Sequence, residues 1–146
     1  MLSRPNMMNY LVDPDAPTPQ NPTSSQIRHF LGGGFHLQTE GGFGAVLVNN
    51  TPALSEYRQP TPPNTSDPHR SVPHVEFHCH YLYIVRHSYT WLLYRQPLDF
   101  PTTISPNVTG FNISAFALQF GLGQPLAGNF MTVSTNPAAL AAAGES

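Results

Sequence analysis

The chain has 146 residues, a formal net charge of −2 and 10% charged residues, against about a quarter in an average soluble domain. This length suits one domain, and six basic residues against eight acidic ones argue against nucleic acid or an anionic membrane surface as the partner. The single cysteine excludes an internal disulfide, and no apolar run approaches the roughly 20 residues that span a bilayer. Sixteen prolines and 11 glycines disfavour long helices and favour a loop-rich β protein.

Short apolar runs separated by proline clusters predict the strands. The first, Met7 to Val12, stops at Asp13-Pro14-Asp15-Ala16-Pro17, where two prolines fix φ and remove backbone donors. The next strand, Ile27–Leu31, is expected to end at the glycine run 32–34. A structured loop or extended segment is expected from Tyr57 to Pro68. The remaining strands are expected at Ala45–Val48, Tyr89–Tyr94 and Ala127–Ser134.

One short helix is expected at Ile113–Phe120. Its apolar residues follow the spacing of a single helix face, Asn112 is a suitable N-cap, and Gly121 can end the helix. Residues 135–146 are rich in alanine and are expected to form a disordered tail. The predicted fold class is therefore mainly β with a short C-terminal helix.

Polar residues recur beside the prolines: Asp13 and Asp15, then His29, then His69-Arg70 after Asp67-Pro68. A carboxylate pair near imidazoles, on loops stiffened by proline, can form a small site that binds an anion while the acids orient the donors. Each piece alone has a simpler interpretation. Asp-Pro-Asp is also typical of a turn, and His29 of a half-buried histidine.

Taken in order, these segments resemble the phosphatidylethanolamine-binding protein family, in the style of its fungal members. The resemblance covers residues 10–70 and 89–134. It is carried by Leu11-Val12-Asp13-Pro14-Asp15-Ala16-Pro17, Arg28-His29-Phe30-Leu31, Ser55-Glu56-Tyr57, Asp67-Pro68-His69-Arg70, Tyr89-Thr90-Trp91-Leu92-Leu93-Tyr94, Phe111-Asn112-Ile113-Ser114-Ala115-Phe116 and Gly121-Leu122-Gly123-Gln124-Pro125-Leu126.

The resemblance implies an antiparallel β-sandwich with a shallow anion pocket and no catalytic role. It implies a phosphate-containing ligand such as a phospholipid headgroup, a serine carboxypeptidase or a kinase as protein partner, and neither cofactor nor metal. Arg70 is expected to be a structural ion-pair partner of a motif aspartate. The residues that match the pocket are Asp13, Asp15, Pro17, His29, Pro63, His69 and Tyr89.

The start of the chain departs from the family pattern. The family's first strands precede the Asp-Pro-Asp segment, but here only twelve residues do, so the N-terminal strands are expected to be missing from a partial domain over residues 1–134. The compartment is left open. The chain as written suits the cytoplasm, whereas Asn-x-Ser/Thr sequons at Asn49, Asn64, Asn107 and Asn112 are compatible with secretion.

A second departure is an 18-residue segment, residues 71–88, between Arg70 and Tyr89, which adjoin in the family pattern. Our hypothesis is a retained short intron. The genetic code permits a GT donor that spans the codons of Arg70 and Ser71, and a YAG acceptor that spans those of His87 and Ser88. Its removal would restore His69-Arg70-Tyr89.

Alternative interpretations use the same residues. The segment holds His74, His78, Cys79, His80 and His87, which could supply a metal site only by bending a strand-like stretch, so an insertion without a selected role is favoured over metal binding. The Asp/His pocket could instead support acid–base chemistry on a small metabolite. A truncated or misspliced product without function is a third interpretation.

The intron hypothesis makes a testable prediction. Sequencing of cDNA across codons 70–89 should find transcripts that lack the 54 nucleotides encoding residues 71–88. Retention of all 54 nucleotides in nearly every transcript would reject the hypothesis.

Overall fold

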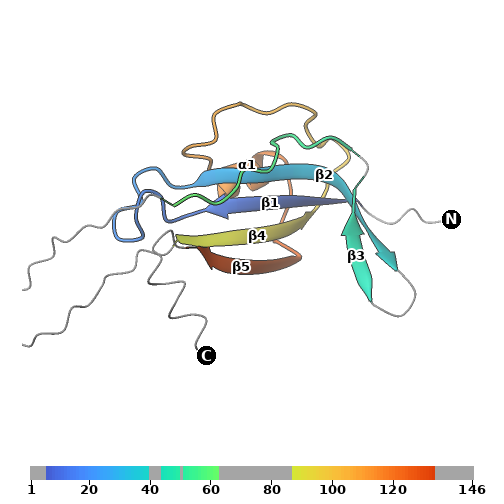
Figure 1. Cartoon of the computed structure of the whole chain (residues 1–146). Helices are drawn as coiled ribbons and strands as arrows, with labels where there is room; N and C mark the ends of the chain where they lie inside the picture. The colour runs from blue at the N-terminus through green and yellow to red at the C-terminus, as the bar shows by residue number, and fades with distance from the viewer. Residues whose placement is uncertain (1–5, 40–43, 50, 63–86, 134–146) are drawn as a thin grey trace, which may run out of the picture.

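A computed structural model describes residues 6–39, 44–49, 51–62 and 87–133 (Figure 1). Five antiparallel strands form one curled sheet in the order β3-β2-β1-β4-β5, and one helix follows β4. The predicted mainly β class with a short C-terminal helix is confirmed, and the predicted tail at 135–146 lies outside the described residues. The elements are β1 (Met7–Asp13), β2 (Ile27–Thr39), β3 (Ala45–Val48), β4 (His87–Arg95), α1 (Ile113–Gln119) and β5 (Ala127–Val133).

β1 is the central strand and is paired on both sides, with β2 and with β4. Because side chains alternate along a strand, Met8, Tyr10 and Val12 share one face, and Leu11 and Asp13 share the other. All five are buried. An apolar strand buried on both faces explains why Met7 to Val12 was readable from the sequence.

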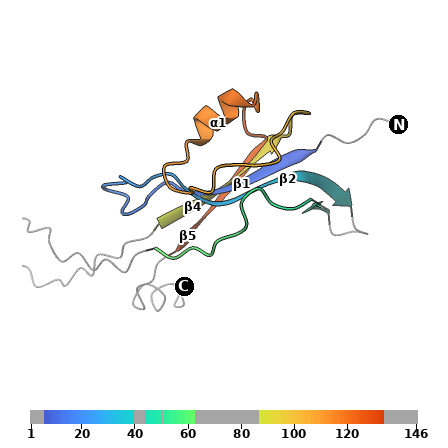
Figure 2. The same cartoon turned by 90° about the horizontal axis from the view of Figure 1, so that it is seen from above.

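The main core lies between the sheet and α1, which covers one face of it (Figure 2). Ile113 and Phe116 of α1 pack with the core face of β1, together with Leu31 and Tyr94. The side chain of Asn112 accepts a hydrogen bond from the backbone N–H of Ala115 at 2.9 Å, as expected for an N-cap. Within the described residues, no helix is long and apolar enough to cross a bilayer.

The same interface buries a charged side chain, Arg28 of β2. Its guanidinium lies 4.7 Å from the centre of the Phe111 ring and donates to the carbonyl of Ser105 at 2.7 Å. Burial lowers the pKa of Arg28 from its ordinary value. The cation–π contact and this hydrogen bond fix segment 105–111 over the sheet.

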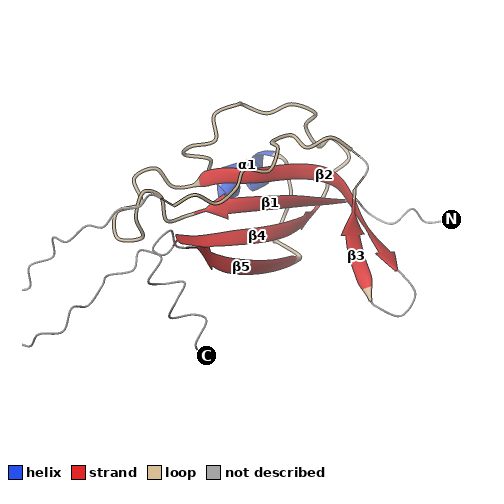
Figure 3. Ribbon diagram, viewed as in Figure 1, coloured by secondary structure: helices blue, strands red, loops and turns tan. Residues whose placement is uncertain are grey.

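β2 runs through the glycine run 32–34 to Thr39, so the predicted strand end at Gly32 is wrong. Gly34 has φ of +71°, and the strand bends in this region and pairs with β3 beyond it (Figure 3). A side chain at Gly33 would meet Gln96 and Phe100 at 2.8 Å. The glycines therefore allow close packing and a bend within the strand instead of ending it.

A bulge near the start of β2 sets the orientation of His29. Val12 pairs with Arg28, whereas Leu11 pairs with Phe30, so β2 has one extra residue at this point. Arg28 stays on the core face, and His29 lies on the opposite face, beside the start of β4. Segment 51–62 runs along this part of β2, where the N–H of Arg58 donates to the carbonyl of His29 at 2.8 Å. A structured loop was predicted there, and residues 57–62 contain no regular secondary structure.

Three buried tyrosines make stability sensitive to alkaline pH. Burial raises the pKa of Tyr10, Tyr89 and Tyr94 above the ordinary value of 10.0. The native phenols therefore keep their protons at a pH where the unfolded chain releases them, and the free energy of unfolding should fall as pH rises above 10. The limiting slope is about 1.4 kcal/mol per pH unit for each tyrosine.

Urea unfolding at pH 9 to 11.5 measures this slope. The variant Tyr10→Phe should have a smaller slope, because it lacks the contribution of one buried tyrosine. The chain has six tyrosines, so a phenolate absorbance near pH 10 in the still-folded chain that corresponds to more than the three others would contradict the prediction.

Candidate functional site

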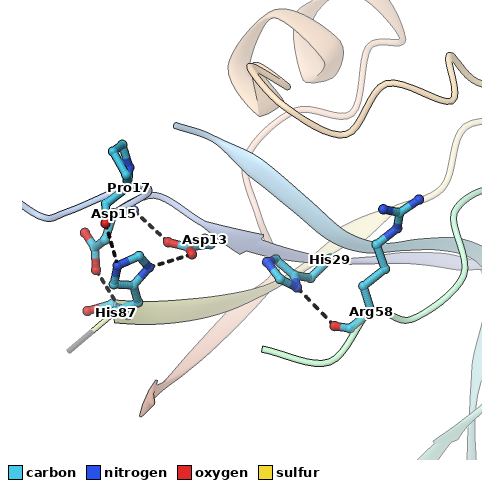
Figure 4. Close-up of polar contacts among 7 residues, drawn as sticks. Asp13, Asp15, Pro17, His29, Arg58 and His87 are labelled. Carbon is cyan, nitrogen blue, oxygen red and sulfur yellow. Dashed lines mark hydrogen bonds and ion pairs between the residues drawn. The ribbon is translucent and has the colours of Figure 1, made fainter. Parts of the chain in front are cut away.

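The ends of three neighbouring strands bring the site residues together. Asp13 ends β1, His87 and Tyr89 lie at the start of β4, and His29 lies near the start of β2. Because β1 is antiparallel to both neighbours, its last residue meets the first residues of β2 and β4 (Figure 4). The site is therefore formed by the central strand and its two partners.

The centre of the site is a buried pair, Asp13 and His87. The Nδ1 of His87 lies 2.8 Å from the Oδ2 of Asp13, and the two side chains are 0% and 3% exposed. The Nε2 of His87 lies 3.1 Å from the carbonyl oxygen of Pro17. Carboxylate and carbonyl oxygens only accept hydrogen bonds, so both contacts form together only when both ring nitrogens carry hydrogen. This environment suits an imidazolium paired with a carboxylate.

The Asp-Pro-Asp segment closes a turn around this pair. The backbone N–H of Asp15 donates to the Oδ1 of Asp13 at 2.8 Å, which is the Asx-type turn considered as the simpler interpretation. The carboxylate of Asp15 in turn accepts a hydrogen bond from the backbone N–H of Ser88 at 2.5 Å. The turn is thereby tied to the first residues of β4.

Tyr89 packs between the two histidines. Its ring centre lies 5.0 Å from that of His29 in an edge-to-face contact and 6.4 Å from that of His87 in a stacked one. The side chain is 1% exposed. Burial raises its pKa, and so do the negative charge of Asp13, a hydrogen bond to that carboxylate and the charge of Asp15. The phenol therefore remains a neutral donor throughout the physiological pH range.

His29 provides a polar group that the contacts around Asp13 and His87 do not use. Its Nδ1 lies 3.0 Å from the carbonyl oxygen of Arg58, so this nitrogen carries the hydrogen and donates. Among the described residues, the ring makes its hydrogen bond through Nδ1 and none through Nε2. The Nε2 can accept from a ligand in the neutral ring, or donate in the imidazolium.

The structure brings together most of the predicted site. Asp13, Asp15, Pro17, His29 and Tyr89 meet at this end of the sheet. Pro17 contributes a carbonyl oxygen, where a wall residue was expected. Pro63, His69 and Arg70 lie outside the described residues, and their roles remain predictions.

Sequence reasoning missed His87 and Ser88, because both were assigned to the segment 71–88. They are the first two residues of β4. A signal was present in the sequence: His87 stands two residues before Tyr89, the spacing that the family motif would give to His69 if residues 71–88 were absent.

The remaining residues of the alternative metal site, His74, His78, Cys79 and His80, lie outside the described residues. In the described ranges, no three His, Cys, Asp or Glu side chains are placed to hold a metal ion together.

A curled antiparallel sheet with a buried Asp–His pair at one end defines a β protein with a hydrogen-bonded cluster of polar side chains at that end. A sequence model of the family "Phosphatidylethanolamine-binding protein" matches residues 6–75. Together with the solved structures that share its fold, this match supports the resemblance of the chain to the phosphatidylethanolamine-binding protein family.

Individual proteins are also similar to the chain. A 26 kDa secreted antigen of Toxocara canis is 43% identical over 51 residues, which cover 30% of this chain and 20% of that protein. A crystal structure of carboxypeptidase Y inhibitor complexed with the cognate proteinase has a TM-score of 0.68 at 21% identity and covers 93% of this chain. The solution structure of CG7054 has a TM-score of 0.54 at 25% identity and covers 94%. The chain spans 63% and 66% of these two structures, respectively.

The buried pair predicts a large cost for Asp13→Asn. The substitution removes the charge that His87 faces, and we expect the free energy of unfolding to fall by about 1–3 kcal/mol. Asp99→Asn makes the same chemical change at an exposed residue and should change stability by less than about 0.5 kcal/mol. Urea unfolding of both variants measures the difference, and equal effects would contradict the assigned Asp13–His87 contact.

Proposed function

We propose that this chain is a binding protein whose site accepts a phosphate-like group, such as a phospholipid headgroup or a free phosphate ester. The observation that carries the proposal is the buried Asp13–His87 pair, which fixes the ends of β1 and β4 around His29 and Tyr89. A site whose polar groups are held in place before the ligand arrives loses little entropy on binding. The match of the phosphatidylethanolamine-binding protein family model to residues 6–75 supports the same conclusion.

The residues divide between holding the site and contacting the ligand. Asp13 and the carbonyl of Pro17 hold the His87 ring, and Asp15 holds the backbone of Ser88. The Nε2 of His29 is the direct ligand contact, and the Tyr89 ring supports it from the side. Pro63 and His69 are proposed as further lining residues and Arg70 as an ion-pair partner, on the sequence motif alone.

Binding is favoured over catalysis by the way the polar atoms are already used. Both nitrogens of His87 and both oxygens of Asp13 have hydrogen-bond partners. A general base needs an available lone pair within reach of the substrate's proton. The alternative of acid–base chemistry would therefore depend on His29.

A second candidate function is inhibition of a proteinase. It is favoured by the shared fold with carboxypeptidase Y inhibitor, a protein whose structure was solved in complex with its cognate proteinase. We propose a serine carboxypeptidase as the partner class. A kinase is the other partner implied by the sequence resemblance.

Titration with inorganic phosphate and with O-phosphoethanolamine, followed by NMR, tests the binding site. His29→Ala should weaken binding of both by about tenfold or more, because it removes the available ring nitrogen. His36→Ala, a matched change on β2 in the strand pair with β3, should leave the affinity unchanged. Equal affinity of the two variants would overturn the assigned site.

Carboxypeptidase Y activity, assayed with increasing amounts of the full chain, tests the inhibitor function. A loss of activity that saturates with added chain is the expected result. Unchanged activity at a large excess of the chain would contradict inhibition of this proteinase and leave the phosphate result standing.

A further inference from the structure

The segment 71–88 places a histidine, His87, two residues before Tyr89. His87-Ser88 precedes Tyr89 in this chain, and His69-Arg70 would precede it if residues 71–88 were absent. Both arrangements place a histidine two residues before Tyr89. They differ at the next position, which is serine in one and arginine in the other.

We propose that His87 takes the place that the family motif gives to His69, and that the segment 71–88 weakens anion binding because it puts Ser88 where Arg70 would stand. The second half of this inference rests on the proposed function. The first half concerns the folded chain alone and needs no ligand.

The strand register explains why either histidine could fill the position. Side chains two residues apart on a strand share a face, so a histidine two residues before Tyr89 is directed to the same side as the tyrosine. Tyr89 pairs with Met131 and His87 with Val133, which fixes this stretch of β4 on the sheet. From there His87 reaches Asp13 at 2.8 Å. The position on the strand, independent of the segment that supplies the histidine, creates the contact.

The charge balance explains why the next residue affects affinity. The site holds two carboxyl side chains, Asp13 and Asp15, and one buried histidine, His87, which pairs with the first of them. Ser88 offers Asp15 only its backbone N–H. An arginine at this position would stand beside Asp15 and offset its charge, so the potential met by an incoming anion would be less negative. The chain without residues 71–88 should therefore bind phosphate more tightly.

The first experiment tests the histidine exchange by double-mutant cycles with Asp13→Asn, using urea unfolding. In the full chain, His87→Ala and Asp13→Asn should be coupled by about tenfold in the unfolding equilibrium constant, and His69→Ala should be uncoupled. In the chain lacking residues 71–88, His69→Ala should show the coupling instead. His87→Asn, which keeps one donor, replaces His87→Ala if that variant is unfolded.

The second experiment compares phosphate affinity in the full chain, the shortened chain and the full chain with Ser88→Arg. The last two should bind about tenfold more tightly at low salt, and the gain should shrink as salt rises. Ser88→Gln is the uncharged control and should bind like the full chain.

The outcomes separate the claims. Coupling of Asp13 to His69 but not to His87 in the full chain would overturn the exchange. Equal phosphate affinity of the full chain, the shortened chain and Ser88→Arg would overturn the weakening by the segment. Absence of phosphate binding in all forms would overturn the proposed function and the weakening, while the coupling result would still decide the exchange.

Discussion

The structure depends on one buried interaction, the pair between Asp13 and His87. It joins residues 74 positions apart, the end of the central strand and the start of its neighbour. Removing two charged groups from water is costly, and the cost is offset here because Asp13 also accepts the N–H of Asp15 and a hydrogen bond from Tyr89. The pair therefore holds both the turn after β1 and the register of β4, and the rest of the site is arranged around it.

The site combines this fixed frame with one irregularity, the bulge of β2. A regular ladder would give each residue of β2 a partner on β1, whereas the extra residue at His29 lets its ring pack against Tyr89 while Arg28 remains in the core. Bulges commonly redirect side chains next to binding sites. The hydrogen-bonded Asp13–His87 pair and the Nε2 of His29 are the features on which the proposed binding function rests.

The sequence predicted those elements whose patterns are local. β1, β3 and α1 followed from apolar runs, helix periodicity and the Asn112 cap. The continuation of β2 through three glycines was not predictable, because it depends on Gln96 and Phe100, which approach Gly33 from far along the chain. His87 was missed for a related reason: its role is set by pairing with β1 and β5, and the residues just before it carry no family pattern.

The separation of Asp13 and His87 also bears on how the chain tolerates a change of length. The entropic cost of closing a loop grows only with the logarithm of its length, about 0.6 kcal/mol for each doubling. Shortening the 74-residue separation by 18 residues would change this cost by only about 0.2 kcal/mol. An insertion between the two strands is thus nearly neutral for the assembly of the sheet, provided that a histidine still stands two residues before Tyr89. Chain length here is free to vary, and strand register is not.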